Sequence, residues 1–172
     1  MREHQQSLFC VKCANASLVK EGQKAYRCQA CDFVYFHNVA AAVGALIICD
    51  EQVLLVKRAQ QPGKGQLDLP GGFVDYAESN EQALKRELFE ELQLAVNTMQ
   101  YLASYPNHYL YQDVLYHTLD CFFVVNLTTK PNVILQQSEV STFDWVNLSN
   151  IPLEQLAFES GRSAIQKYLA TV

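Results

Sequence analysis

The sequence predicts an α/β protein with layers packed around a mixed sheet, preceded by a small cysteine-bound segment. Beyond residue 37 the periodic runs are β-rich, then helical, then β-rich, then helical, without an internal repeat. The first 36 residues hold four of the six cysteines and few aliphatic runs. We therefore expect two domains, 1–36 and 37–172, and an α+β arrangement of the same elements is the alternative for the larger one.

Composition and charge limit the classes of partner. The chain has 172 residues, 49% of them hydrophobic, and a net charge of −5. This length suffices for one main core with a small appendage. An acidic chain is poorly suited to broad electrostatic binding of nucleic acid or anionic membrane, although a local basic cluster keeps nucleic acid open. A phosphate-rich ligand would need metal ions to bridge the like charges.

The amino-terminal segment gives no targeting signal. The stretch MREHQQSLFC is polar and lacks the apolar centre of a signal peptide. The longest apolar run, residues 39–49, is too short to span a bilayer. We therefore expect a cytoplasmic protein that does not associate with membranes.

The cysteines of the first segment form two C-x2-C pairs. Cys10 and Cys13 make the first pair, Cys28 and Cys31 the second, and fourteen residues separate the pairs. Two such pairs supply the four thiolates that tetrahedral Zn²⁺ prefers. Disulfides are the alternative, and the expected compartment disfavours them. The pattern predicts a zinc ribbon, and because four protein ligands close the site, its Zn²⁺ should be structural.

Apolar runs predict the strands of the larger domain. The first two strands are expected at residues 42–49 and 52–58, joined by a turn. Residues 60–75 are rich in Gly and Pro and predict a loop with one or two short strands. Cys49 and Cys121 lie in apolar runs and are expected to be buried thiols. Further strand-like runs cover 94–106, 115–127 and 140–148, and an amphipathic helix covers 158–172.

One helix, expected over residues 79–92, carries an unusual group of acids. At about 100° per residue, Glu87, Glu90 and Glu91 fall in one sector roughly 100° wide. Glu87 and Glu91 are four residues apart, a spacing at which like charges repel. Divalent cations such as Mg²⁺ or Mn²⁺ relieve that repulsion and bind clustered carboxylates. The adjoining sector holds the leucines that would face the core, Leu84, Leu88 and Leu92.

The surrounding sequence, GFVDYAESNEQALKRELFEELQL from Gly72, resembles the Nudix box, G-x5-E-x7-R-E-U-x-E-E-x-G-U. The runs AAAVGALI, VLLVKRA and FDWVNLSNI look like strands that flank the box in this family, so the resemblance covers residue 39 to the end. A four-cysteine ribbon ahead of the box is similar to that of NADH pyrophosphatase-like members. The matching box positions are Gly72, Glu78, Arg86, Glu87, Leu88, Glu90, Glu91 and Leu94.

The resemblance implies an α/β/α sandwich and the hydrolysis of a nucleoside diphosphate linked to another moiety. It assigns Glu87, Glu90 and Glu91 as ligands of Mg²⁺ or Mn²⁺. One of these, or a downstream glutamate, would orient or deprotonate the attacking water. Glu139 lies where many members have one more acidic metal ligand, and an exposed loop acid is its alternative reading. Arg86 would fix the rotamers of the carboxylates.

The resemblance also assigns the junction before the helix. The carbonyl of Gly71 or Gly72 would be a further metal ligand or a contact to substrate, and Glu78 would support the junction. One position departs from the box, because Gln93 stands where the family has glycine. A glutamine in a left-handed conformation costs about 1 kcal/mol. We therefore expect an altered helix end near Gln93 and retained activity.

The substrate is the least determined feature. The Ser-Gln-Pro-Trp run that follows the box in NADH pyrophosphatases is absent. Tyrosines stand in that region instead, and Tyr109 and Tyr111 are candidates for stacking on a nucleobase or flavin. Packing within a strand is the alternative, which we favour. ADP-ribose, NADH, FAD and a capped RNA end all stay open.

Two functions from different classes follow. The first is a Mg²⁺- or Mn²⁺-dependent pyrophosphohydrolase of a small-molecule nucleotide. The second is a Nudix-fold binding module, regulator or processor of NAD-capped RNA ends that uses the ribbon to recognise its partner. The intact box glutamates favour the first, and we favour a ribbon that only packs on the catalytic domain or supports a homodimer. The second hypothesis depends on the basic residues of the ribbon, Lys12, Lys20, Lys24 and Arg27.

Overall fold

The computed structural model describes residues 8–172, and the chain divides into two compact units, Met1–Val39 and Ala40–Val172. The smaller unit contains a three-stranded antiparallel sheet in the order β1-β2-β3. A turn at Gly22, with φ of 78°, lies between the first two strands. The three strands are β1 Leu18–Glu21, β2 Ala25–Cys28 and β3 Val34–Phe36.

The larger unit contains a seven-stranded mixed sheet. Its main path is β10-β5-β4-β9-β8, while β6 pairs with β5 and β7 pairs with β4. The pair of β4 and β9 is parallel, and the other pairs are antiparallel. The strands are β4 Ala40–Cys49, β5 Gln52–Arg58, β6 Leu67–Asp68, β7 Gly71–Phe73, β8 Gln100–Tyr111, β9 Val114–Asn126 and β10 Val140–Asn147.

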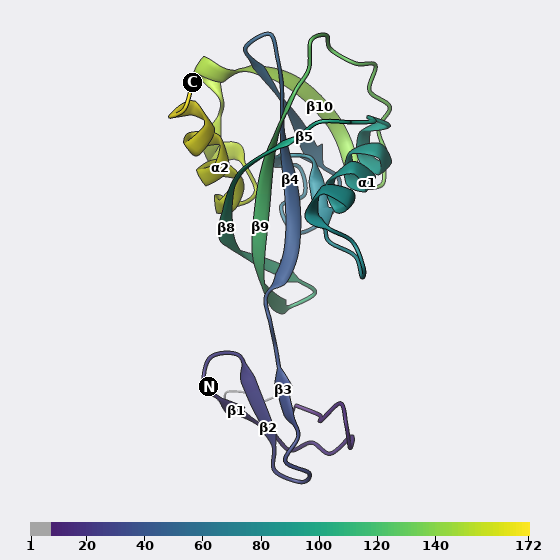
Figure 1. Cartoon of the computed structure of the whole chain (residues 1–172), viewed down its shortest axis with the longest axis vertical. Coiled ribbons are helices and arrows are strands. Elements are labelled where there is room, and N and C mark those ends of the chain that lie inside the picture. The colour runs from purple at the N-terminus through teal and green to yellow at the C-terminus, as the bar shows by residue number, and fades with distance from the viewer. Residues whose placement is uncertain (1–7) are drawn as a thin grey trace. The chain divides into compact units, whose positions relative to one another are not determined.

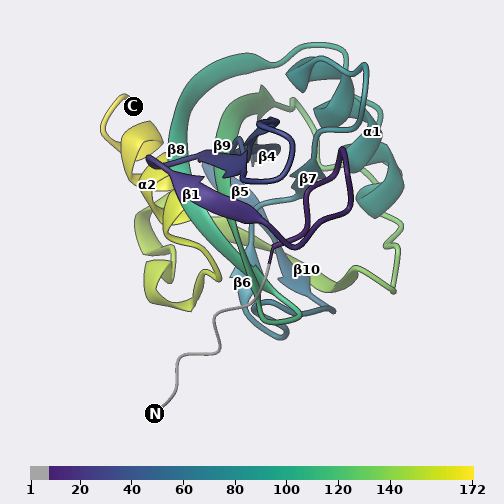
Figure 2. The same cartoon turned by 90° about the horizontal axis from the view of Figure 1, so that it is seen from below.

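Two α-helices cover the two faces of this sheet. Helix α1, Asn80–Leu92, lies on one side of the strands and helix α2, Glu159–Leu169, on the other, as both views show (Figures 1 and 2). Two short 3-10 helices, η1 Leu148–Asn150 and η2 Leu153–Gln155, precede α2. Within residues 8–172, no helix is both long enough and apolar enough to cross a membrane. The predicted α/β/α sandwich around a mixed sheet is confirmed.

The central strand β4 explains why the sandwich has two cores. Ala45 and Ile47 belong to the hydrophobic cluster beneath α1, whereas Leu46 and Ile48 belong to the cluster beneath α2. Successive side chains of a strand point to opposite faces, so a strand that is buried on both faces must be continuously apolar. The run that predicted this strand is therefore uninterrupted. The helical partners of these strand residues are Ala83, Leu84, Leu88 and Leu92 in α1 and Ala164 and Ile165 in α2.

The strand predicted from residue 94 is wrong in its first part. Residues 94–99 are irregular, and β8 begins only at Gln100 and continues to Tyr111. Leu94 and Val96 are nevertheless buried in the cluster beneath α1. The apolar pattern therefore reported burial, and a loop that packs on the core gives the same pattern as a strand.

Specific residues define both ends of helix α1. Ser79 is its N-cap, and a capping box joins Ser79 and Gln82 through backbone-to-side-chain hydrogen bonds in both directions. At the other end, Gln93 adopts the left-handed conformation itself, with φ of 53° and ψ of 33°. Its side chain also donates to the carbonyl oxygen of Phe89 at 2.9 Å. This hydrogen bond offsets part of the strain, so the end of the helix is not distorted as expected.

Candidate active site and metal centres

The four cysteines of the smaller unit lie together. The Sγ atoms of Cys10 and Cys31 are 3.8 Å apart, and those of Cys13 and Cys28 are 3.6 Å apart. All four sulfur atoms lie within 4.8 Å of one another. In a tetrahedral site with Zn–S bonds of about 2.3 Å, neighbouring sulfurs are about 3.8 Å apart. The donor set therefore fits one Zn²⁺ ion.

The two C-x2-C loops share one backbone conformation. The amide of Ala14 donates to the carbonyl of Cys10 at 2.8 Å, and that of Asp32 donates to the carbonyl of Cys28 at 2.9 Å. Ala14 and Asp32 both have positive φ, 60° and 57°. Each loop thus turns back at the residue after its second cysteine. The repeated turn aims two sulfur atoms from each loop at a common centre.

In the larger unit, helix α1 brings carboxylates against strand β7. The side chains of Glu87 and Glu91 are buried, although both are acidic. One oxygen each of Glu87, Glu91 and Glu139 lies within 4.8 Å of the others. Burying like charges together is unfavourable without a compensating cation. Three carboxylate oxygens at this spacing are suitable ligands for Mg²⁺ or Mn²⁺.

Two glycines permit this close approach. Gly72 pairs with Val43 in β4, and a Cβ atom on Gly72 would lie 2.5 Å from Oε1 of Glu87. Gly71 has φ of 145°, and its Cβ atom would lie 2.1 Å from the carbonyl oxygen of Val43. The amide of Gly71 donates to Oε2 of Glu91 at 3.0 Å. A Cβ atom at Gly71 would therefore clash with the backbone of β4, whereas one at Gly72 would clash with the carboxylate of Glu87.

Arg86 connects the helix to the loop that precedes it. Its Nε and Nη2 atoms donate to the two oxygens of Glu78 at 2.8 and 2.9 Å, a bidentate pair. Its Nη1 atom lies 2.7 Å from Glu87 and 3.1 Å from Glu90. Nη2 also donates to the carbonyl of Phe73 at 3.0 Å. Glu90 is thus held by Arg86 and stands half-exposed beside the buried glutamates.

Burial changes the acidity of the two inner glutamates. It raises the pKa of Glu91 from 4.5 to about 8, even though the Gly71 amide and its hydrogen bond oppose the shift. Burial also raises the pKa of Glu87, against the opposing effect of Arg86. In the metal-free protein the Glu91 carboxyl is therefore largely protonated at neutral pH. A cation that binds there must displace its proton.

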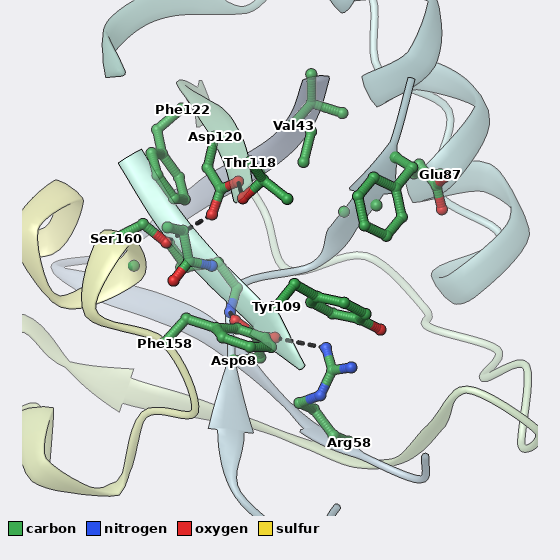
Figure 3. A pocket seen from close by; sticks show the side chains of 18 of the residues that line it. Val43, Arg58, Asp68, Glu87, Tyr109, Thr118, Asp120, Phe122, Phe158 and Ser160 are labelled. Atoms are coloured by element: carbon green, nitrogen blue, oxygen red, sulfur yellow. Dashed lines mark hydrogen bonds and ion pairs between the residues drawn. The ribbon is translucent and has the colours of Figure 1, made fainter. Parts of the chain in front are cut away.

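These residues border a cavity of about 340 Å³ (Figure 3). Among the described residues that line it, Arg58 is the one basic side chain, while six carboxylates face the space. Gly71, Gly72 and Tyr109 also line it, whereas Tyr111 does not and is 42% exposed. The acidic residues of the lining are Asp68, Asp75, Glu87, Glu91, Asp120 and Glu139.

Aromatic side chains form one wall of the cavity. The rings of Tyr109 and Phe158 stack with centroids 5.6 Å apart, and Phe73 meets Tyr109 edge-on at 5.2 Å. The Arg58 guanidinium lies 4.9 Å from the centroid of Phe158 and bonds Asp68 at 2.8 Å. Burial raises the pKa of Asp68 to about 6 despite this partner. Tyr109 thus packs against Phe73 and Phe158, and it also lines the cavity. The packing that we favoured for it is therefore compatible with stacking on a substrate ring.

Sequence reasoning missed the other polar end of the cavity. Thr118, Asp120 and Ser160 are buried and form one hydrogen-bonded group, with Asp120 at its centre. The signal was present, because an aspartate interrupts the apolar run LDCFFVV. Ser160 gave no comparable signal, because it lies in α2, forty residues after Asp120, and nothing in the sequence connects the two positions.

The layered fold, with an acidic cavity between a glycine-rich strand and a carboxylate-bearing helix, is that of a NUDIX-domain protein. A family model described as NUDIX domain matches residues 39–168. The chain belongs to this family.

Two curated relatives of this chain are named as hydrolases of nucleotide compounds. The chain is 29% identical over 175 residues to a protein named NAD-capped RNA hydrolase NudC from Deinococcus radiodurans, covering 99% of this chain and 59% of that protein. It is 29% identical over 153 residues to a protein named ADP-ribose pyrophosphatase from Methanocaldococcus jannaschii, covering 89% of this chain and 83% of that protein. The chain thus spans about three-fifths of the length of the first relative.

Solved structures agree on the fold. The MutT NUDIX hydrolase from Burkholderia pseudomallei has a TM-score of 0.66 and 26% identity, covering 76% of this chain and 98% of that chain. The NUDIX domain of Shewanella oneidensis NrtR, solved with ADP ribose, has a TM-score of 0.66 and 25% identity, covering 79% of this chain and 90% of that chain.

Removal of one cysteine ligand should unfold the smaller unit selectively. In Cys28→Ser the metal site loses one of four thiolates, so we expect the bound zinc to fall from one ion per chain to a small fraction. Residues 8–39 should then become sensitive to protease while residues 40–172 stay resistant. Metal analysis and limited proteolysis measure both effects. Cys49→Ala, at a buried position outside the cluster, should keep its zinc. A zinc-free wild-type protein with a resistant smaller unit would contradict the assignment.

The two glycines of β7 should respond differently to alanine. Gly71→Ala forces a Cβ atom against the backbone of Val43 at positive φ, so it should lower the free energy of unfolding by about 2 kcal/mol or more. Gly72→Ala displaces only the Glu87 side chain, so it should weaken Mn²⁺ binding about tenfold or more with a smaller loss of stability. Chemical denaturation and Mn²⁺ titration measure the two quantities. Equal Mn²⁺ affinity in Gly72→Ala and wild type would refute the assignment of Glu87.

The metal-free protein should lose stability as the pH rises. Glu91 binds its proton more tightly in the folded state than in the unfolded state, so its contribution is complete below pH 4.5 and is lost as the pH approaches about 8. The slope for one proton is at most about 1.4 kcal/mol per pH unit. Urea denaturation without added Mg²⁺ or Mn²⁺ measures it. Glu91→Gln should flatten this part of the profile, and parallel profiles for the two proteins would disprove the linkage.

Proposed function

We propose that the larger unit hydrolyses the diphosphate linkage of a nucleoside diphosphate joined to another moiety, with Mg²⁺ or Mn²⁺ as cofactor. The convergence of Glu87, Glu91 and Glu139 on one cavity carries the proposal. A diphosphate would meet six carboxylates and one guanidinium there, so it can enter only together with cations. Bound Mg²⁺ or Mn²⁺ would neutralise the diphosphate oxygens and acidify water.

The carboxylates that would bind these ions are held in place by neighbouring groups of the protein. Glu87 and Glu91 are held by Arg86 and by the Gly71 amide, so their carboxylates are oriented before any ligand arrives. Glu90, the other ligand predicted on α1, is outside the group of three converging carboxylates and does not line the cavity, because Arg86 holds it in a half-exposed position. The Gly71 amide points at Glu91 of α1, whereas Gly72 pairs with Val43 of β4, which favours Gly71 over Gly72 as the source of a carbonyl ligand.

We assign the proton transfer to Glu139. Hydrolysis adds the oxygen of a water molecule to one phosphorus, breaks the bond from that phosphorus to the bridging oxygen, and yields two phosphomonoesters. The proton of the water must go to a base that can release it to solvent. Glu139 is exposed and accepts one hydrogen bond, from Nε2 of Gln136 at 3.3 Å, whereas Glu87 and Glu91 are buried. It is therefore the carboxylate best placed for repeated proton exchange.

A second substrate class is favoured by one comparison. Relatives named NAD-capped RNA hydrolase align with 99% and 98% of this chain, a range that includes the four cysteines. A capped RNA end contains the same diphosphate linkage as NAD, so the cavity would perform the same reaction on it. The basic residues of the ribbon would then contact the RNA phosphates.

A product-resolved panel tests the proposal. ADP-ribose, NADH, FAD, diadenosine polyphosphates, nucleoside triphosphates and NAD-capped RNA are incubated with Mg²⁺ or Mn²⁺, and the products are separated. We expect cleavage between the two phosphates. Glu91→Gln and Glu90→Gln should abolish turnover. Glu139→Gln should lower kcat by about a hundredfold or more, while Mn²⁺ still binds through Glu87 and Glu91.

The control is Glu154→Gln, which removes an exposed carboxylate from η2, away from the cavity. It should keep wild-type turnover. Near-normal rates in both Glu90→Gln and Glu91→Gln would refute the metal site. If the wild type cleaves no member of the panel, the binding-module function replaces catalysis.

A further inference from the structure

The cavity has a second polar end that the diphosphate chemistry does not use. Asp120 is buried, at 9% exposure, and lies on the floor of the cavity with Thr118 and Ser160. In Figure 3 these three residues lie together on one side, and Glu87 lies on the other. A carboxylate so far inside needs a structural reason or a ligand.

The hydrogen-bond directions make Asp120, Thr118 and Ser160 together an acceptor group. The Thr118 hydroxyl donates to Oδ1 of Asp120 at 2.6 Å, and the Ser160 hydroxyl donates to Oδ2 at 2.7 Å. Each hydroxyl has one hydrogen, and both hydrogens are committed to the carboxylate. The second acceptor site of each Asp120 oxygen and the lone pairs of the two hydroxyls remain. The group can therefore accept hydrogen bonds from a ligand and can donate none.

Strand geometry directs this group into the cavity. Thr118 and Asp120 are two residues apart in β9 and point to the same face. Their register partners in β8 are Asn107 and Tyr105, and Asn107 lines the cavity as well. Ser160 reaches the same point from the first turn of α2. The hydrogen bond between Ser160 and Asp120 also holds α2 on the sheet. That structural role does not explain why the hydrogen-bonded group borders a cavity.

The aromatic wall adjoins this acceptor end. Phe158, which stacks on Tyr109, is two residues before Ser160, so the same segment supplies the ring and the hydroxyl. The Arg58 guanidinium also contacts the Phe158 ring and is itself held by Asp68 and by the carbonyl of Pro62 at 2.7 Å. Planar apolar surface next to acceptors suits a flat ring whose edge carries hydrogen-bond donors.

We infer that Asp120, oriented by Thr118 and Ser160, determines specificity for a heterocycle that presents an N–H donor at its edge. The inference rests on the proposed function and names the part of the substrate that the second end of the cavity selects. An exocyclic amino group or a carboxamide satisfies Asp120. A carbonyl or carboxylate at the same place leaves Asp120 unpaired or repels it.

Direct binding tests the inference without requiring hydrolysis. Calorimetry with Mg²⁺ compares two pairs of mononucleotides that differ only at the ring edge. AMP against purine riboside 5′-monophosphate replaces the exocyclic amino group by hydrogen, and nicotinamide mononucleotide against nicotinic acid mononucleotide replaces a carboxamide by a carboxylate. We expect a preference of about tenfold or more for the donor-bearing member of one pair. The pair that shows the preference identifies the ring that the site binds.

Variants assign the preference to Asp120. In Asp120→Asn the shape is kept and an amide donor replaces one acceptor oxygen, so the preference should fall to about onefold or reverse. Ser160→Ala should reduce it less, because Thr118 still orients the carboxylate. Asp144→Asn, an exposed position on β10, is the matched control and should retain it. Circular dichroism confirms that each variant is folded.

Two results would overturn the inference. One is a wild-type protein without preference in either pair, including failure to bind any of the four mononucleotides. The other is a folded Asp120→Asn variant with an unchanged preference. Failure of the proposed function is a separate result, in which the mononucleotides bind with the expected preference and no diphosphate is cleaved.

Discussion

The larger unit depends on one close contact, the approach of helix α1 to strand β7. It buries Glu87 and Glu91 against a backbone that carries no side chains at Gly71 and Gly72. Two carboxylates at i and i+4 repel each other, and burial removes the water that would screen them. Within residues 8–172, the Gly71 amide and the Arg86 guanidinium are the groups that donate hydrogen bonds to these two carboxylates. Burial is the main cause of the raised pKa values of both glutamates, and a bound cation would lower them by favouring the charged carboxylates.

Arg86 makes this contact rigid. One guanidinium donates to three carboxylates and to a backbone carbonyl, so it ties the helix to the loop before it and to the end of β7. The bidentate pair with Glu78 fixes its plane. Its single positive charge leaves the acidic surplus of the cavity in place. The charge of Arg86 is thus used to hold the carboxylates in place, and the acidic residues that remain in the cavity favour the binding of metal ions.

The features that could be predicted from the sequence are those that depend on the spacing of nearby residues. The register of Gly72, Glu78 and the helix glutamates lies within 20 residues, so one helix and one turn determine it. The two C-x2-C pairs are local in the same sense. The irregular loop at 94–99 was mistaken for a strand because burial and strand formation leave the same apolar pattern. At Gln93 the expected distortion is absent, because the glutamine side chain bonds the last turn of the helix.

The acceptor end of the cavity could not be predicted in this way, since long-range packing assembles it. Thr118 and Asp120 come from β9, and Ser160 comes from α2 forty residues later. The sandwich itself separates the two ends. Helix α1 supplies carboxylates from one face of the sheet, while α2 completes the acceptor group from the other face. Substitutions on β9 and α2 can then change which moiety is bound without moving the glutamates on α1, so a conserved reaction and a variable substrate are compatible within one fold.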